Sequence, residues 1–172
     1  MIKFSKVTYL TKLSHNAPII ILFLSVLNEL DFNYLGIKYF SFNFPFILIF
    51  FWSLKKSESL GYGLIFVAGL FNDVILGFPI GISSFSYLVI CGFAGYLKNI
   101  TLRQSLLKDW LFFLITVSVV TSLMYSILVL FFSVSLDYND ILVNLLFTFL
   151  FYVIFAYIFE IYLKLVFGRT NV

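Results

Sequence analysis

Charged residues divide the chain into long apolar runs. Uncharged runs cover residues 13–28, 39–54, 59–72, 74–97, 110–136 and 141–159. A membrane-spanning helix needs about 20 mostly apolar residues, so the two shortest early runs must borrow flanking residues, and six crossings then fit the chain. The pattern predicts spans near 14–34, 39–55, 60–77, 80–97, 110–135 and 140–163.

Helices are the expected form of these spans. In lipid every backbone N–H and C=O group must be paired within the protein, which leaves helices or a closed barrel. The phenylalanines alternate at Phe40, Phe42, Phe44 and Phe46, as in a strand, but the other runs lack the alternation that a barrel needs. We therefore expect an all-α integral membrane protein in which residues 1–172 form a single transmembrane domain.

The composition supports this prediction. Of the 172 residues, 62% are hydrophobic and 11% are charged, whereas an ordinary soluble domain carries about 25% charged residues. A small soluble core would also have to bury 24 Phe and 11 Tyr with few charges to cover it. Disorder is excluded as well, because it requires low hydrophobicity.

The basic residues predict the orientation, because Lys and Arg in short loops stay on the cytoplasmic side of the membrane. If the N-terminus is cytoplasmic, every Lys and Arg except Lys38 lies on that side. Trp52 and Trp110 then lie at the cytoplasmic interface, where tryptophan is favoured. Both termini are therefore expected in the cytoplasm. The basic residues are spread over several loops and form no single patch, so we expect no nucleic-acid partner.

A stripe of small residues lies in the predicted third span. Gly61, Gly69, Asp73 and Gly77 recur at multiples of four residues, so on one helix they would share one face. Small residues at this spacing let a second helix approach closely within the membrane. The chain then reverses over residues 77–81. The charges fit both two full spans and a re-entrant hairpin in this region, and both alternatives stay open.

Asp73 is the candidate functional residue of this region. A carboxylate at membrane depth costs at least about 2.5 kcal/mol and usually faces the interior of a helix bundle. One hypothesis is that Asp73 holds two helices together through Ser83, Ser84 or the backbone across the turn at residues 77–81. The other is that it takes part in ion or proton passage. We favour the first.

Catalysis has no support in the sequence. The chain has one histidine, His15, and one cysteine, Cys91, which cannot supply a metal site of the usual composition. Glu160 is expected about 13 Å from Asp73 along the membrane normal, too far for a general acid and base that act together. We expect no enzyme activity, no metal and no cofactor.

Residues 69–90, GLFNDVILGFPIGISSFSYLVI, resemble the signature of the MreD family of rod-shape-determining proteins. That signature is a Gly-x-x-x-Asp element followed by Gly-x-Pro-Leu-Gly. The matching positions here are Gly69, Asp73, Gly77, Pro79 and Gly81, with Ile80 in place of the usual Leu. Phe51 and Trp52, followed by Lys55 and Lys56, are similar to an aromatic pair before basic residues in that family.

The resemblance implies a multi-pass protein of the bacterial inner membrane in the cell-elongation machinery. It implies an MreC-like single-span coiled-coil partner and, directly or indirectly, an MreB-type filament and the peptidoglycan synthase complex. It also implies a fold similar to the substrate-binding subunit of energy-coupling-factor transporters. The first helix lacks the small-x-x-x-small alanine motif of that subunit, which weakens a transport role.

Two functions follow as hypotheses. The first is a non-enzymatic scaffold that docks partner transmembrane helices and so regulates cell shape and side-wall peptidoglycan synthesis. Its structural or helix-packing motif would comprise Gly61, Gly69, Asp73, Gly77, Pro79 and Gly81. The alternative is a small-molecule carrier or transporter substrate-binding subunit with a pocket near the middle of the membrane.

Overall fold

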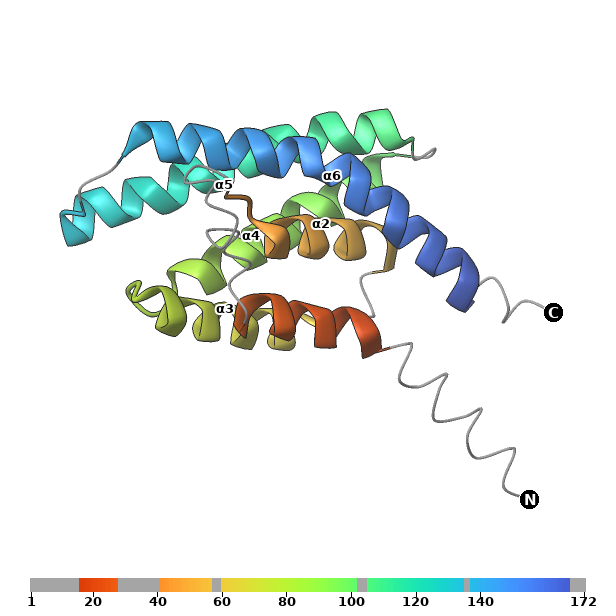
Figure 1. Cartoon of the computed structure of the whole chain (residues 1–172), viewed down its shortest axis with the longest axis horizontal. Helices are drawn as coiled ribbons and strands as arrows, with labels where there is room; N and C mark the ends of the chain where they lie inside the picture. The colour runs from red at the N-terminus through yellow and green to blue at the C-terminus, as the bar shows by residue number, and fades with distance from the viewer. Residues whose placement is uncertain (1–15, 28–40, 57–59, 102–104, 135–136, 168–172) are drawn as a thin grey trace, which may run out of the picture.

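The structure is a computed structural model, and it describes residues 16–27, 41–56, 60–101, 105–134 and 137–167. Within these ranges the chain forms helices and no strand. The helices are Asn16–Leu27, α2 (Phe44–Lys56), α3 (Tyr62–Leu76), α4 (Ile82–Ile100), α5 (Leu106–Phe132) and α6 (Tyr138–Phe167). Helices α5 and α6 lie along one side of the molecule, α3 and the helix Asn16–Leu27 lie along the other, and α2 and α4 lie between them (Figure 1).

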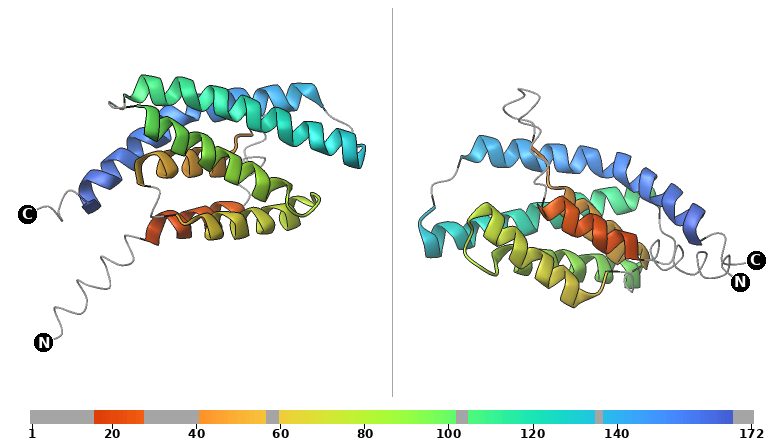
Figure 2. Two further views of the ribbon diagram at one scale, coloured as in Figure 1. Left: turned by 180° about the vertical axis from the view of Figure 1, so that it is seen from behind. Right: turned by 60° about the horizontal axis from the view of Figure 1, so that its bottom comes forward.

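Helix α2 occupies the centre of the bundle. Every residue from 44 to 54 is buried, whereas a helix with one face on solvent or lipid would leave a stripe exposed. The ring of Phe50 lies 5.1 Å from that of Phe113 in α5 and 5.8 Å from that of Tyr152 in α6. The apolar run at residues 39–54, which is shorter than a membrane span needs, forms this helix. The helix is apolar on all faces because other helices surround it. The left view of Figure 2 shows α2 with α5 and α6 on one side and the helix Asn16–Leu27 on the other.

The N-terminus of α2 is capped by Asn43. The side-chain oxygen of Asn43 accepts a hydrogen bond of 3.3 Å from the N–H of Phe46, the arrangement of a helix N-cap. The N–H of Asn43 itself donates to the hydroxyl of Thr148 in α6 at 2.8 Å. The start of the central helix is therefore fixed to α6.

Helix α5 begins at Leu106, earlier than the predicted start near residue 110. The hydroxyl of Ser105 accepts a hydrogen bond of 3.4 Å from the N–H of Lys108, and Asp109 lies in the first turn, where the helix dipole favours a negative charge. The charged residues before the predicted span at 110–135 therefore form the first helical turn.

Two of the described helices, α5 and α6, are long and apolar enough to cross a membrane, over 27 and 29 residues. Helices α2 and α3 have 13 and 15 residues, or about 20 and 23 Å at 1.5 Å per residue, which is shorter than a hydrocarbon core of about 30 Å. The helical fold class is therefore observed. The six crossings and the side on which the termini lie stay predictions, and residues 28–34 of the predicted first span are outside the described part of the chain.

Candidate functional site

Asp73, on the last turn of α3, is completely buried, with an exposed fraction of 0%. Its Oδ2 accepts a hydrogen bond of 2.7 Å from the N–H of Gly81, and its Oδ1 accepts one of 2.8 Å from the N–H of Ser83. These N–H groups belong to the start of α4 and have no partner within that helix. The carboxylate of one helix therefore caps the next, with its negative charge at the favourable end of the helix dipole.

The backbone of Asp73 closes α3 at the same time. Its carbonyl oxygen accepts hydrogen bonds from the N–H groups of Gly77 and Phe78, the latter at 2.9 Å. Gly77 is in the left-handed conformation with φ of 68°, and Gly81 has φ of 106°, values that a residue with a Cβ rarely adopts. Pro79 lies between them, and its carbonyl accepts from the N–H of Ile82 at 3.4 Å. Asp73 thus fixes both ends of the turn at residues 77–81.

Gly69 is the point of closest contact between α3 and α4. A Cβ at this position would lie 2.4 Å from the Cα of Ser84, a distance that no pair of carbon atoms tolerates without displacement of the backbone. The hydroxyl of Ser84 donates to the carbonyl of Phe66 at 2.9 Å. One turn further along, Asn72 donates from Nδ2 to the hydroxyl of Ser83 at 3.0 Å. The two helices are therefore held together by backbone contact and by hydrogen bonds.

The predicted stripe is not one continuous packing face. Gly61 is the N-cap of α3 with φ of 62°, and Gly77 is its C-cap. Both are exposed, and no neighbouring atom would obstruct a Cβ at Gly77 or Gly81. Of the four stripe positions, only Gly69 and Asp73 lie against α4. A spacing of four does not reveal where a helix stops, and the glycines at the two ends of α3 serve the backbone conformation there.

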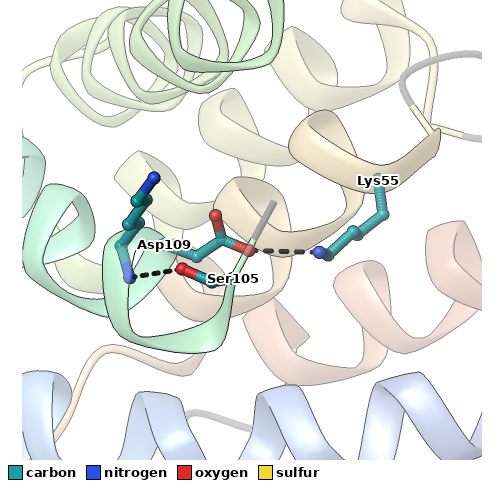
Figure 3. A network of polar contacts seen from close by, with 4 residues as sticks. Lys55, Ser105 and Asp109 are labelled. Atoms are coloured by element: carbon teal, nitrogen blue, oxygen red, sulfur yellow. Dashed lines mark hydrogen bonds and ion pairs between the residues drawn. The ribbon is translucent and has the colours of Figure 1, made fainter. Parts of the chain in front are cut away.

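A buried ion pair joins the opposite ends of α2 and α5 (Figure 3). Nζ of Lys55, in the last turn of α2, lies 3.1 Å from Oδ2 of Asp109, in the first turn of α5. The exposed fractions of the two side chains are 17% and 1%. Beside this pair Trp110 stacks on Phe149 with ring centroids 4.5 Å apart and donates from Nε1 to the Phe149 carbonyl at 2.9 Å.

The sequence interpretation missed this pair. Asp109 was left unassigned because it lies among charged residues that looked like a loop. The signal that could have found it is the acidic residue in a first helical turn, next to an interfacial tryptophan and on the side where most lysines were predicted.

A cavity of about 270 Å³ lies at the other end of the bundle, where α3 ends and α2, α4 and α6 begin. Each described helix contributes to its wall. None of the described lining side chains is charged. They are Ser25, Ser41, Phe42, Asn43, Phe44, Pro45, Phe46, Asn72, Leu76, Phe78, Ser83, Met124, Tyr125 and Asn144.

A second hollow of about 490 Å³ lies between α5 and the first half of α6, and we call it the α5–α6 groove. Its wall combines apolar side chains with a row of hydroxyl groups on α5. Tyr125 lines both this groove and the cavity. The described lining residues are Ser118, Thr121, Ser122, Tyr125, Ser126, Val129, Leu130, Tyr138, Ile141 and Leu145.

The remaining candidates lie apart from these features. Cys91 is buried at 2% exposure and accepts a hydrogen bond of 3.4 Å from the Ser53 hydroxyl. Glu160 and Lys164 form no ion pair in the structure, although both are in its described part. His15 lies outside the described residues. In the described ranges no three His, Cys, Asp or Glu side chains gather as metal ligands would.

Comparison with curated proteins found no match, and comparison with solved structures found none either. The model of a protein family described as rod shape-determining protein MreD matches residues 12–166, which is most of the chain and includes the Asp73 turn. This family consists of membrane proteins that determine cell shape and is not a known enzyme family. The chain therefore belongs to the MreD family, with a role in rod-shape determination, and the predicted resemblance is confirmed.

Proposed function

We propose that this protein is a non-enzymatic scaffold of the bacterial inner membrane that docks transmembrane helices of the cell-elongation machinery. The proposed direct partner is an MreC-like single-span coiled-coil protein. Through it, or directly, the scaffold connects to an MreB-type filament and to the peptidoglycan synthase complex. Its effect is to regulate cell shape and side-wall peptidoglycan synthesis.

The bonding of Asp73 is the observation that carries this proposal. Both carboxylate oxygens accept backbone N–H groups of α4, at 2.7 and 2.8 Å, and the side chain is fully buried. A carboxylate that bonds in this way joins the end of one helix to the start of the next. It thereby builds a rigid framework, which is what a docking protein requires.

The outward faces of α3, α5 and α6 expose apolar side chains to which partner helices could bind. Large apolar side chains are exposed on each of them, including Val74 at 68%, Leu130 at 78% and Tyr157 at 61%. Within a bilayer such faces meet lipid or other helices, and helices associate there by close packing and interhelical hydrogen bonds. The hydroxyl row in the α5–α6 groove offers groups of the second kind.

Site-specific photocrosslinking tests the proposal in cells. A photoreactive amino acid is placed at Val74, Leu130 or Tyr157 of the full chain, and crosslinked products are purified and identified by mass spectrometry. We expect a single-span coiled-coil protein to be captured from one of these faces and not equally from all three. Capture of no such protein, or equal capture from every face, contradicts a defined docking surface.

A variant at Gly69 tests whether the close contact between α3 and α4 is needed for partner binding. Gly69→Leu forces α3 away from Ser84, so we expect less of the partner to co-purify and cells to lose their rod shape. Gly63→Leu is the matched control, because Gly63 is in the same helix and is exposed with open space around it. If the partner co-purifies equally with the Gly69→Leu protein and the cells keep their rod shape, the contact between α3 and α4 is not needed for docking.

A further inference from the structure

We propose that the cavity between the starts of α2, α4 and α6 binds an uncharged, hydroxyl-bearing group of about the size of a sugar ring. The group could belong to a membrane lipid headgroup or to a free solute. The inference concerns a ligand inside the bundle and does not depend on the docking of partner helices to its outside.

The first argument is the convergence of amide side chains. Asn43 precedes α2, Asn72 lies on α3 and Asn144 lies on α6, yet all three line one cavity. All three are partly buried, and Asn144 is bonded within the chain, donating from Nδ2 to the Ser41 hydroxyl at 2.7 Å and accepting through Oδ1 from the Thr148 hydroxyl at 3.4 Å. Amide side chains from three separate parts of the chain therefore give this cavity a polar wall at the edge of a core that is mostly aromatic and aliphatic.

The second argument is hydrogen-bonding capacity that the chain leaves unused. Asn72 donates from Nδ2 to Ser83, and its Oδ1 has no partner among the described residues. Asn43 accepts through Oδ1 from Phe46, and its Nδ2 likewise has none there. An asparagine amide has two donor hydrogens and an acceptor oxygen. The cavity thus offers both a donor and an acceptor, which a hydroxyl group can satisfy together.

The third argument concerns charge and shape. The described residues of the lining present amides, hydroxyl groups and aromatic rings, and these are groups that recognise an uncharged hydroxyl-bearing ligand. Phenylalanines and one tyrosine form much of the remaining wall, and aromatic faces suit the C–H surface of a ring. The volume of about 270 Å³ is just below the range of sites for drug-sized ligands, which run from about 300 to 1,000 Å³, and is consistent with a single ring.

Tyr125 indicates how a lipid could present such a group. Its side chain lines both the cavity and the α5–α6 groove. Beside its hydroxyl row the groove has aliphatic side chains from both helices, such as Leu130 and Leu145, and both helices are long enough to cross a membrane. A headgroup in the cavity could therefore continue into an acyl chain along the groove without leaving the protein surface.

Two probes separate the two sources of the ligand. The full-length purified protein is placed in phosphatidylcholine nanodiscs that contain either a glucosyl diacylglycerol or phosphatidylglycerol, and retained lipid is counted by native mass spectrometry. Free methyl glucoside is tested by equilibrium dialysis. We expect retention of the glucosyl lipid above phosphatidylcholine. Binding of methyl glucoside as well would identify a site open to free solutes, and its failure to bind would identify a lipid headgroup site.

Variants assign the binding to the cavity. Asn72→Leu and Asn43→Ser should each weaken retention by about tenfold, the effect of one hydrogen bond to a buried group. Serine caps helices as well as asparagine does, so Asn43→Ser should keep the unfolding temperature and report the cavity alone. Asn99→Leu, at an exposed position of α4 outside the cavity, is the control and should bind like the wild type.

Three results would overturn the proposal. They are no retention of either glucosyl probe above phosphatidylcholine, preference for phosphatidylglycerol over the glucosyl lipid, or equal retention by the Asn72→Leu, Asn43→Ser and Asn99→Leu proteins. Each can occur while partner capture by the outward faces succeeds, so the failure of this inference is distinguishable from the failure of the docking proposal.

Discussion

The carboxylate of Asp73 and the N–H of Gly81 are joined by a hydrogen bond of 2.7 Å across the turn between α3 and α4. Together with the bond to Ser83 it lets a single side chain at the end of one helix cap the start of the next. Because the same residue also ends α3 through its carbonyl oxygen, the turn at residues 77–81 depends on Asp73 more than on any of its own side chains.

Asp73→Asn tests this dependence. The amide keeps one acceptor oxygen and replaces the other with a donor that faces a backbone N–H, so we expect a loss of about 2 kcal/mol in the free energy of unfolding. The measurement is unfolding of the purified protein by a denaturing detergent. Asp140→Asn is the matched control, because Asp140 is exposed in the first turn of α6 and should lose less than about 1 kcal/mol. Equal losses in the two variants would contradict a capping role.

The contact at Gly69 predicts opposite effects for two glycine substitutions in one helix. Gly69→Ala brings a Cβ within 2.4 Å of the Ser84 backbone and should destabilise the protein by about 1 to 3 kcal/mol through overpacking. Gly63→Ala meets no atom and should be neutral or stabilising by up to about 1 kcal/mol, because alanine favours helix over glycine. Thermal unfolding followed by circular dichroism measures both, and a Gly69→Ala protein as stable as Gly63→Ala would show that the helices are not in close contact.

The Lys55–Asp109 pair should behave as a buried ion pair. Lys55→Met leaves the 1% exposed carboxylate of Asp109 without its countercharge, and we expect a loss of about 3 kcal/mol. Adding Asp109→Leu should recover much of that loss, because two apolar side chains can replace a buried pair. A double-mutant cycle measures the coupling. If the double variant is as unstable as the sum of the single variants, the two side chains do not interact.

Trp110 should stabilise the α5–α6 pair in two separable ways. Trp110→Phe keeps an aromatic ring against Phe149 and removes the hydrogen bond to its carbonyl, for an expected loss of about 1 kcal/mol. Trp110→Ala removes both and should cost about 3 kcal/mol. The neighbouring Leu111→Ala, at an exposed position, serves as the control in the same unfolding assay. An equal cost for Phe and Ala at position 110 would mean that the ring contact contributes nothing.

The features that could be predicted from sequence are those that are local. An acid within an apolar stretch, followed by glycines at a turn, was enough to predict that Asp73 holds two helices together, and the observed bonds have that arrangement. The roles of Gly61 and Gly77 were not accessible, because a periodic spacing carries no information about where a helix ends. Their positive φ angles became visible only with the backbone.

The features that could not be predicted depend on tertiary structure. Lys55 and Asp109 are far apart in sequence and meet because the last turn of α2 lies beside the first turn of α5. The asparagines of the cavity come from separate parts of the chain, and each alone looks like an ordinary polar residue near a span end. No pattern along the sequence indicates that they converge.

The enclosure of α2 has a consequence for how the protein is made. Synthesis proceeds from the N-terminus, so α2 leaves the ribosome before α4, α5 and α6, whose side chains cover it. Until α6 has been made, the side of the Phe50 ring that will contact Tyr152 has no protein partner. Final assembly must therefore wait for the C-terminal helix, and a chain that ends before α6 would expose its own centre.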